Sequence, residues 1–439
     1  MAVLRPPPLW EYQRAVVEAQ VTELVLLGVV QMGKTFALAV WLYMGAFMKS
    51  NSLNWWAAPT YSQAEVGFRE MRTHLERSGA LARITESRLR LDLVNGSRIE
   101  CRSWERDENL LGAAVDRIAV DQAELLTPRA RAILSTRRAA TLGPMFFSGN
   151  AGIHGSEFWR LCKQAEQAVQ AGSADMGFIR WRWQDRYAAL LGEDAAAAEA
   201  YRAFIDSERR NLPSDEFSRL YEGEFLAMGA GVLDLTPVCV NGGDAIHPVS
   251  LPFIEPWDEE KDGPIIGGLD LGNRQSWTVL SLFGRRSGRL KAMLRFREAA
   301  WEVQAARVIE CAKAYGRARD DHGKKRSTVV VFFDQTGVGG PVAEVLQRAS
   351  VNTAVRLSGV VFNSDNKQDM VQALQLETEQ RTISMPYIAE AVDEAANLER
   401  TALATSVRYK APDGFNDDTV WSMGLALHGK ARAVRPVIL

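Results

Sequence analysis

Hydrophobic residues in the first half of the chain form short runs that alternate with longer helical patterns. The segment TFALAVWLYMGAFM (residues 35–48) is apolar on every side, which is typical of a helix buried in a core. The apolar runs that predict strands are Glu23–Leu27, Leu53–Ala58, Arg117–Val120 and Met145–Phe147. Short apolar strands separated by helices predict an α/β fold with a doubly wound, mainly parallel sheet.

The second half has a different order of elements. Three apolar segments joined by short turns predict an antiparallel meander, and a helical pattern follows at 302–319. Two more strands, each followed by a helix, and a last helix from Asp417 complete the order. The segments that predict strands are 264–271, 277–283, 290–296, 328–333 and 355–362. This is the order of an RNase H-like fold with a mixed sheet.

A change in composition divides the 439-residue chain. Residues 156–225 have a mostly helical pattern, whereas residues 226–262 contain GAG, NGG, several prolines and the charged segment WDEEKDG, which are typical of a linker. We therefore predict a first domain at 1–225, a linker at 226–262, a second domain at 263–430 and a basic tail at 431–439.

Composition and charge exclude several classes of protein. Hydrophobic residues make up 47% and charged residues 24%, which excludes general disorder. A net charge of −2 gives no global attraction to nucleic acid, so DNA binding would need local basic patches. The chain has neither an apolar signal-peptide core at its start nor about 18 consecutive apolar residues, so we expect an intracellular, soluble protein with no membrane partner.

The cysteines and histidines argue against a zinc site. The four cysteines, at positions 101, 162, 239 and 311, show no metal-ligand spacing and predict reduced thiols. The five histidines are equally scattered, which argues against a histidine-based nuclease centre.

A phosphate-binding motif begins at the end of the first predicted strand. Residues 28–35 (GVVQMGKT) match G-x-x-x-x-G-K-[ST], after a strand and before a helix as the motif requires. Loop amides and the positive end of the helix would face a phosphate, Lys34 would reach the β- and γ-phosphates, and Thr35 would bind Mg²⁺. The residues expected to bind ATP here are Gly28, Gln31, Met32, Gly33, Lys34 and Thr35.

Polar residues elsewhere in the first half complete a candidate ATPase site. Gln13 could hydrogen-bond adenine, and Asn150, at the end of a strand, could sense the γ-phosphate. Asp121 ends the strand RIAV and is the expected magnesium-associated carboxylate. Hydrolysing ATPases of this type usually have Glu in the next position, where this chain has Gln122. Either Glu124 takes that role, or Gln122 positions water as a neutral group, or hydrolysis is impaired.

Aspartates in the second half predict a separate metal site. Asp270 lies in the first strand of the meander, Asp334 ends the strand TVVVFFD, and Asp417 and Asp418 open the last helix. In an RNase H-like sheet the first and fourth strands are neighbours and the last helix packs beside them, so these carboxylates would converge. Two Mg²⁺ or Mn²⁺ ions about 4 Å apart could activate water and stabilise the leaving oxygen of a phosphodiester. Of the adjacent pair, we favour Asp418 as the metal ligand.

Together these motifs resemble the large terminase subunit of tailed bacteriophages, prophages and gene transfer agents. The resemblance spans residues 8–430 in the expected order, and the ordered set is far more specific than any one motif. The stretches that carry it are Ala58–Ala64 (APTYSQA), Ser103–Gly112 (SWERDENLLG), Phe147–Asn150 (FSGN), Tyr221–Phe225 (YEGEF), Lys367 in NKQD, and FNDD at 415–418.

The resemblance implies an enzyme with two activities. One is an ATPase that translocates double-stranded DNA into an empty procapsid through the portal protein, and the other is a metal-dependent endonuclease that cuts concatemeric DNA. It also implies ATP and Mg²⁺ as cofactors, with Mn²⁺ as an alternative at the nuclease site, a small terminase subunit as partner, and a pentameric ring on the portal. We expect a monomer or weak oligomer when free, in the host bacterial cytoplasm and not in the mature virion.

The chain departs from this family where arginines are often found. Val29 and Val30 lie within the phosphate loop where the family often has Arg, and Leu111 stands where an Arg often precedes the glycine. The arginine that would act on a neighbouring subunit's nucleotide must then lie elsewhere. The candidate is Arg106, with Arg102 and Arg117 as alternatives.

Two other functions remain as alternatives. An ATP-binding assembly module, with hydrolysis weak or lost at Gln122, could dock on a portal or small subunit. A repair-type helicase–nuclease ranks last, because residues 152–260 contain no helicase motif. The basic residues available for a DNA backbone, each of which could equally be solvated surface, are Arg285, Arg286, Arg289, 324–326 (KKR) and 430–435 (KARAVR).

Overall fold

The chain folds as two compact units. The first comprises Met1–Arg210 and Asp215–Ala227, and the second comprises Asn211–Ser214 and Met228–Leu439. Each unit has its own sheet and its own hydrophobic core. The computed structural model describes residues 4–112, 114–240, 248–272, 276–298, 300–316, 329–336, 339–402 and 407–432.

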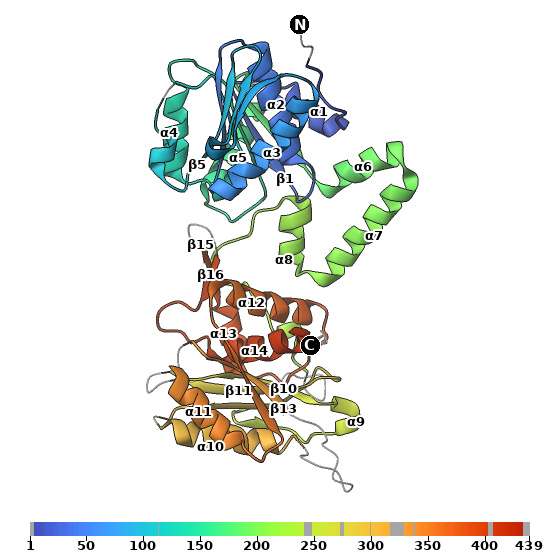
Figure 1. Cartoon of the computed structure of the whole chain (residues 1–439). Helices are drawn as coiled ribbons and strands as arrows, with labels where there is room; N and C mark the ends of the chain where they lie inside the picture. Colours follow the sequence, from blue (N-terminus) through green and yellow to red (C-terminus); the bar gives the residue numbers. More distant parts are fainter. Residues whose placement is uncertain are drawn as a thin grey trace. The chain divides into compact units, whose positions relative to one another are not determined.

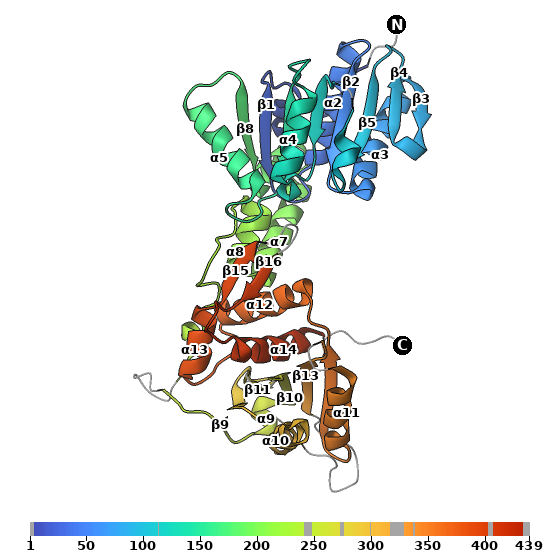
Figure 2. The same ribbon diagram turned by 90° about the vertical axis from the view of Figure 1, so that its left-hand side faces the viewer.

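An eight-stranded sheet forms the centre of the first unit, in the order β3-β4-β5-β2-β6-β7-β1-β8. Neighbours from β5 to β8 are parallel, whereas β3, β4 and β5 are joined antiparallel. Figure 2 shows the β3–β4 hairpin at one edge and β8 at the other. The strands are β1 (Glu23–Gly28), β2 (Leu53–Ala58), β3 (Leu81–Thr85), β4 (Arg90–Leu93), β5 (Arg98–Ser103), β6 (Arg117–Val120), β7 (Met145–Gly149) and β8 (Met176–Trp181).

Helices cover both faces of this sheet, which confirms the predicted doubly wound arrangement. Apolar side chains of α1, α2 and α3 pack on one face, and those of α4 and α5 pack on the other. Successive strand residues alternate between the two cores, as Trp55 and Trp56 of β2 do. These helices are α1 (Glu11–Val17), α2 (Lys34–Met48), α3 (Tyr61–Arg77), α4 (Pro128–Arg137) and α5 (Glu157–Gln170), with short 3₁₀ turns η1 (Glu86–Arg88), η2 (Asp107–Leu110) and η3 (Ala123–Leu125).

The first unit differs from the sequence-based expectation at both edges of its sheet. The segment 156–225, predicted as mostly helical, contains β8, which pairs with β1 only. The strands β3, β4 and β5 were not predicted. In β5 (RIECRS), buried and partly exposed residues alternate, so this strand lacks the continuous apolar run that marks the central strands.

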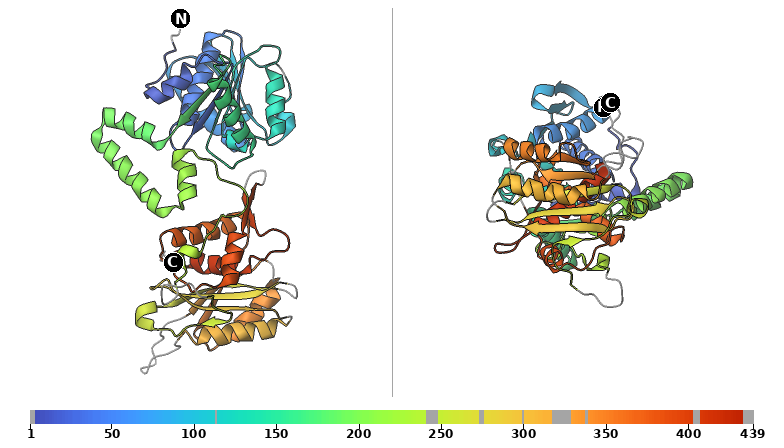
Figure 3. Two further views of the ribbon diagram at one scale, coloured as in Figure 1. Left: turned by 180° about the vertical axis from the view of Figure 1, so that it is seen from behind. Right: turned by 90° about the horizontal axis from the view of Figure 1, so that it is seen from below.

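A helical extension follows β8, and all of it except Asn211–Ser214 belongs to the first unit. It consists of α6 (Trp183–Glu193), α7 (Ala195–Asn211), α8 (Ser214–Phe217) and a π-helical turn η4 (Ser218–Glu222). Seen from behind, α6 and α7 stand away from the sheet of the unit (Figure 3, green). No residue of α6 is buried, so its position depends on a few side-chain contacts.

The second unit is built on a six-stranded mixed sheet in the order β14-β13-β10-β11-β12-β9. The strands β10, β11 and β12 form the predicted antiparallel meander, and β13 pairs parallel with β10. The first and fourth predicted strands are thus neighbours. The strands are β9 (Phe253–Ile254), β10 (Ile265–Asp270), β11 (Thr278–Gly284), β12 (Leu290–Phe296), β13 (Val329–Asp334) and β14 (Val355–Val360), with a separate hairpin of β15 (Glu399–Ala402) and β16 (Val407–Lys410).

Helices also cover both faces of this second sheet. Figure 1 shows α12, α13 and α14 on one face and α10 and α11 on the other, and the buried side chains divide in the same way. The helices are α9 (Glu259–Asp262), α10 (Trp301–Lys313), α11 (Gly339–Ser350), α12 (Ser364–Glu379), α13 (Ala389–Ala396) and α14 (Asp418–Arg432), with a 3₁₀ turn η5 (Thr236–Val238). In the described stretches, no helix combines the length and apolarity needed to cross a membrane.

Part of the segment expected to be a linker packs into the second unit. Leu233, Leu235 and Val238 are buried in the core beneath α12, α13 and α14. Farther along, β9 adds to the edge of the sheet by pairing with β12. Of the segment 226–262, the first two residues belong to the first unit and the described residues from Met228 onward belong to the second.

Candidate functional site

The loop between β1 and α2 has the conformation that its sequence requires. Gln31 and Gly33 have positive φ angles of 55° and 78°, in the left-handed region. A Cβ on Gly33 would lie 2.6 Å from Nε2 of Gln13, so a larger residue would displace that side chain. Gly28 makes room for Lys34 in the same way, because an added Cβ would lie 2.7 Å from Cδ of the lysine. The loop opens α2 as a phosphate-binding loop does.

Side chains outside the loop hold its carbonyl groups. The carbonyl of Met32 accepts hydrogen bonds from the Tyr12 hydroxyl and from Nε2 of Gln13, each at 3.3 Å. The carbonyl of Gln31 accepts a 2.6 Å hydrogen bond from Arg186, which lies on α6. Gln13 is buried, so its amide supports the loop here, and its contact with adenine stays a prediction.

Lys34 is held at the loop by two acceptors. Its Nζ donates to the carbonyl of Val29 at 2.6 Å and to Oδ1 of Asn150 at 2.8 Å. Burial lowers the pKa of Lys34 to about 8, although the Glu124 and Asp121 carboxylates oppose this shift. Both direct partners are neutral, so phosphate oxygens would give this ammonium group stronger, charge-assisted bonds.

Asp121, at the end of β6, is buried with both carboxylate oxygens hydrogen-bonded. Thr35 Oγ1 donates to Oδ2 at 2.9 Å, and Ser148 Oγ donates to Oδ1 at 2.8 Å. Burial raises the pKa of Asp121 in spite of these bonds. Thr35 and Asp121 thus bring together the hydroxyl and carboxylate oxygens that Mg²⁺ prefers, and a cation there would offset the buried negative charge.

Glu124 contacts the residue that binds the loop lysine. Asn150 donates to it twice, from Nδ2 to Oε1 at 2.7 Å and from its backbone N–H to Oε2 at 3.1 Å. Because Asn150 also accepts a hydrogen bond from Lys34, the side chains of Lys34, Asn150 and Glu124 form one hydrogen-bonded network. Gln122 has a φ of 55° and begins the turn η3, which carries Glu124. This geometry favours Glu124 among the three explanations for the Gln122 substitution.

Gly149 leaves the space that this carboxylate occupies. A Cβ on Gly149 would lie 2.7 Å from Oε2 of Glu124 and 2.8 Å from Cε1 of Phe158. The glycine in the sequence FSGN is therefore required by the close approach of Glu124 to the end of β7.

The first two candidate arginines have different surroundings. Arg106 is exposed at the start of η2, where it could reach another molecule. Arg102 donates to Glu100 at 2.6 Å and lies over the ring of Trp55, so it is engaged within its own chain.

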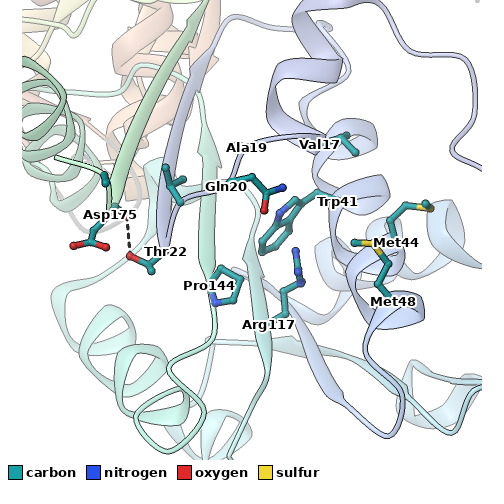
Figure 4. A pocket seen from close by; sticks show the side chains of 12 residues that line it. Val17, Ala19, Gln20, Thr22, Trp41, Met44, Met48, Arg117, Pro144 and Asp175 are labelled. Atoms are coloured by element: carbon teal, nitrogen blue, oxygen red, sulfur yellow. Dashed lines mark hydrogen bonds between the residues drawn. The ribbon is translucent and has the colours of Figure 1, made fainter. Parts of the chain in front are cut away.

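Arg117 lies at the wrong end of its strand for a nucleotide contact. It begins β6, whereas Asp121 follows the end of that strand. Its guanidinium carbon lies 4.6 Å from the centre of the Trp41 ring, and burial lowers the pKa of Arg117. Figure 4 shows Arg117 beneath Trp41 and beside Pro144, in a pocket of about 300 Å³ at the amino ends of the strands. Of the three arginines, Arg106 has the most suitable position.

In the second unit, Asp270 and Asp334 end neighbouring parallel strands. Leu269 of β10 pairs with Phe333 of β13, so the two aspartates follow at the same level. Leu269 and Phe333 point into the core beneath α10 and α11. Because side chains alternate along a strand, both aspartates face the opposite side, where α14 lies.

Close packing of α14 on β10 brings a third carboxylate to this edge. A Cβ on Gly268 would collide with the carbonyl of Ser422, whose Oγ donates to the Gly268 carbonyl at 2.9 Å. Asp418 lies one turn before Ser422 and so on the same face of the helix. Oδ2 of Asp417 instead accepts a 3.0 Å hydrogen bond from the backbone of Ala411. This arrangement favours Asp418 as the inward carboxylate.

The carboxylates at this edge oppose one another electrostatically. Burial raises the pKa of Asp270 well above its usual range, and the charges of Asp418, Asp417 and Asp334 raise it further. Burial, Glu394 and Asp417 together raise the pKa of Asp418 to about 6. The raised pKa values of Asp270 and Asp418 suit a site for divalent cations, which would offset the repulsion.

The carboxylates do not share one ion as they are placed. Within the described stretches, no three His, Cys, Asp or Glu side chains are arranged to hold a metal together. The fit to a metal therefore depends on partly buried, mutually repelling charges, and the assignment of Asp270, Asp334 and Asp418 as ligands stays a prediction.

Three neighbours of the aspartates were not predicted as site residues. Lys367 lowers the pKa of Asp270, and its Nζ lies 4.3 Å from the centre of the Trp421 ring. Glu394 is buried on α13 and pairs with Arg295 at 2.6 Å. The only signal for Glu394 is a carboxylate on the otherwise apolar face of a helix, because buried charges are rarely left without a partner.

The basic residues proposed for DNA are only partly described. Arg289 pairs with Glu255 at 2.7 Å, and Arg286 donates to the carbonyl of Glu260. Lys430 pairs with Glu377 at 2.8 Å. The run at 324–326 and the tail residues 433–439 lie outside the described residues.

The chain is similar to known large terminase subunits along most of its length. It is 25% identical over 429 residues to the large terminase subunit of Thermus phage G20c, and 25% identical over 426 residues to that of Thermus virus P23-45. Each match covers 90% of this chain and 82% of the relative. No protein-family model matches the chain. The matches confirm the resemblance seen in the motifs.

Solved structures share the fold. The large terminase of a thermophilic bacteriophage is similar with a TM-score of 0.55 and 11% identity, over 98% of this chain and 100% of that one. The same phage protein in complex with ADP is similar with a TM-score of 0.52 and 12% identity, over 96% of this chain and 98% of that one. These similarities confirm the fold class.

Proposed function

We infer that the chain belongs to the large terminase subunits and is a DNA-packaging enzyme with two active sites. The first unit hydrolyses ATP to move double-stranded DNA into a procapsid, and the second unit cuts the DNA. The observation that carries this proposal is that one polypeptide combines the hydrogen-bonded network of Lys34, Asn150 and Glu124 at a phosphate loop with a partly buried aspartate cluster around Asp270.

At the ATPase site, each group of residues has a separate task. The loop amides, the start of α2 and Lys34 bind the phosphates. Thr35 and Asp121 would hold Mg²⁺, which would supply positive charge to neutralise the phosphates. Glu124 orients the attacking water and accepts its proton. When a γ-phosphate competes for Lys34, the bond from Lys34 to Asn150 weakens, so Asn150 can carry the nucleotide state to β7 and Glu124.

At the nuclease site, Asp270, Asp334 and Asp418 would hold Mg²⁺ or Mn²⁺, and these cations would supply activated water and stabilisation of the leaving oxygen. Burial of Asp270 among like charges makes cation binding favourable there. Lys367, held against Trp421, adds a positive charge that can contact the phosphate being cut.

The assembly follows from the same assignment. A large terminase subunit works with DNA, a portal and a small terminase subunit, in the host cytoplasm during packaging. Five copies form a ring on the portal, in which Arg106 of one copy contacts the nucleotide of the next. The free chain is a monomer or weak oligomer.

One set of reactions tests both activities. Supercoiled plasmid is incubated with the full chain, Mn²⁺ and ATP, and linearisation and phosphate release are measured in the same tubes. We expect Asp270→Ala to abolish cutting and retain ATP hydrolysis, and Lys34→Ala to do the reverse. Cutting without any ATP hydrolysis by the wild-type chain would contradict the motor. Hydrolysis without cutting, in Mn²⁺ and in a parallel series with Mg²⁺, would contradict the nuclease.

A further inference from the structure

A guanidinium group lies in register with the central aspartate of the nuclease site. Asp270 of β10 pairs with Val279 of β11, and Val279 pairs with Arg295 of β12. Directly paired residues of antiparallel strands point to the same face of a sheet. Arg295 therefore lies two strands from Asp270 on the face that α13 and α14 cover, and two strand spacings amount to about 10 Å.

Arg295 is fixed by two contacts. Its Nη2 donates to Oε1 of Glu394 at 2.6 Å, and its guanidinium carbon lies 4.4 Å from the centre of the Trp277 ring. Both members of the ion pair are largely removed from solvent, with side-chain exposures of 12% for Arg295 and 7% for Glu394. In an ion pair this buried, loss of one partner would leave the other charge uncompensated.

The second oxygen of Glu394 holds the start of α14. Oε2 accepts from the backbone N–H of Thr419 at 2.8 Å and from Thr419 Oγ1 at 2.6 Å. The first N–H groups of a helix have no partner within the helix, so an acceptor from outside fixes the position of the first turn. Thr419 directly follows Asp418, and the two share that turn.

We propose that the Arg295–Glu394 pair positions Asp418 for metal binding, with Glu394 as a positioning residue and not a ligand. The inference builds on the nuclease function proposed above. Both oxygens of Glu394 are already used, one by Arg295 and one by Thr419. Anchored to β12 through Arg295, Glu394 sets where α14 begins and hence where the Asp418 carboxylate stands relative to Asp270.

The decisive variant is Glu394→Gln, which keeps the shape of the side chain. An amide has one acceptor oxygen and an NH₂ group, so it would set a donor against either Arg295 or Thr419. Glu390→Gln is the matched control, since Glu390 lies one turn before Glu394 on α13. Glu390 also lines the small pocket to which Arg295 and Glu394 contribute. Arg295→Lys keeps the charge but loses the planar guanidinium over Trp277. This variant and Thr419→Val provide independent tests if Glu394→Gln does not fold.

The readout is Mn²⁺ binding to the full chain, followed by the electron paramagnetic resonance signal of free Mn²⁺. The measurement is made without nucleotide. The Mn²⁺ ions that the wild type binds and Asp270→Ala does not bind are assigned to the nuclease site. We expect Glu394→Gln to weaken their binding 10–100-fold and to lower plasmid cutting to a similar degree, as loss of a partner of a metal ligand typically does. Glu390→Gln should match the wild type, and all variants should retain ATP hydrolysis.

The outcomes separate this inference from the function on which it builds. If the wild type binds no more Mn²⁺ than Asp270→Ala and cuts no DNA, the nuclease proposal fails. If the wild type binds and cuts while Glu394→Gln, Arg295→Lys and Thr419→Val all match it, the positioning role is wrong. An equal loss in Glu390→Gln would also overturn the inference, because it would reflect the general charge of α13.

Discussion

Asn150 donates two hydrogen bonds to Glu124, at 2.7 Å from its side chain and 3.1 Å from its backbone. Its side-chain oxygen accepts from Lys34 at 2.8 Å, so a single amide connects the loop lysine to a carboxylate. That carboxylate lies two residues beyond the position where such ATPases usually have it. Glu124 lies in the turn η3, and Gln122, directly before that turn, adopts a left-handed conformation.

Glu124→Gln should abolish ATP hydrolysis while nucleotide binding persists. A general base contributes roughly 10²–10⁴-fold to a rate, so we expect a loss of that size in phosphate release. Gln122→Ala should change the rate by only a few-fold, and binding of a fluorescent ATP analogue should be nearly unchanged in both variants. Equal losses in Gln122→Ala and Glu124→Gln would show that Gln122 positions the water.

Gly149→Ala should displace the Glu124 carboxylate without changing its chemical identity. The added methyl would lie 2.7 Å from Oε2 of Glu124, so either Glu124 or the end of β7 must move. We expect hydrolysis to fall at least tenfold and the first unit to lose about 1–3 kcal/mol, as overpacking of a well-packed core usually costs.

Gly152→Ala is the control for this variant. A Cβ there would lie 3.9 Å from Cβ of Glu124, which is ordinary van der Waals contact. Phosphate release and urea unfolding followed by tryptophan fluorescence measure both effects. Equal behaviour of the two alanine variants would mean that the approach of Glu124 to Gly149 has no influence on hydrolysis.

The parts of the fold that the sequence predicts best are those with one dominant physical signal. The central strands β1, β2, β6 and β7 are buried on both faces and therefore appear as apolar runs. The strands β4 and β5 have one partly exposed face, with charged residues at alternate positions, and β8 is an edge strand with four partly exposed residues. Their pattern is hard to distinguish from that of a loop or a helix.

The candidate sites also contain residues that the sequence predicts and residues that only the packing reveals. Asp270, Asp334 and Asp418 each end a strand or begin a helix, so topology predicts that they meet. Glu394 and Arg295 belong to no motif, and their pairing over 99 positions in the sequence depends on how α13 packs on the sheet. Gln13 was predicted from its distance to the loop, but its burial against Met32 depends on the packing of α1 on α2.

Arg106→Ala should reveal a contact between subunits. Arg106 is exposed, so its loss should leave the basal ATP hydrolysis of the free chain unchanged. An arginine supplied by a neighbour is worth roughly 10³–10⁵-fold in phosphoryl transfer, so hydrolysis stimulated by portal-bearing procapsids and DNA should fall to the basal level. Arg102→Ala tests the alternative, and if it alone removes the stimulation, then Arg102 is the arginine that acts on the neighbour.

Asp270→Asn should stabilise the metal-free second unit while abolishing DNA cutting. Asp270 is partly buried and interacts with the charges of Asp418, Asp417 and Asp334, so removing its charge relieves repulsion. If the relief is about 1 kcal/mol, the unfolding temperature of a domain of this size should rise by roughly 2–4 °C.

Mn²⁺ should raise the unfolding temperature of the wild type and leave that of Asp270→Asn almost unchanged, because a ligand stabilises only the state that binds it. The control is Asp365→Asn, an exposed aspartate on α12, which should follow the wild type in both buffers when measured by differential scanning calorimetry. A metal-free Asp270→Asn chain that melts below the wild type would show that the carboxylate is stabilising as it stands, and that the cluster does not need a cation to offset its charge.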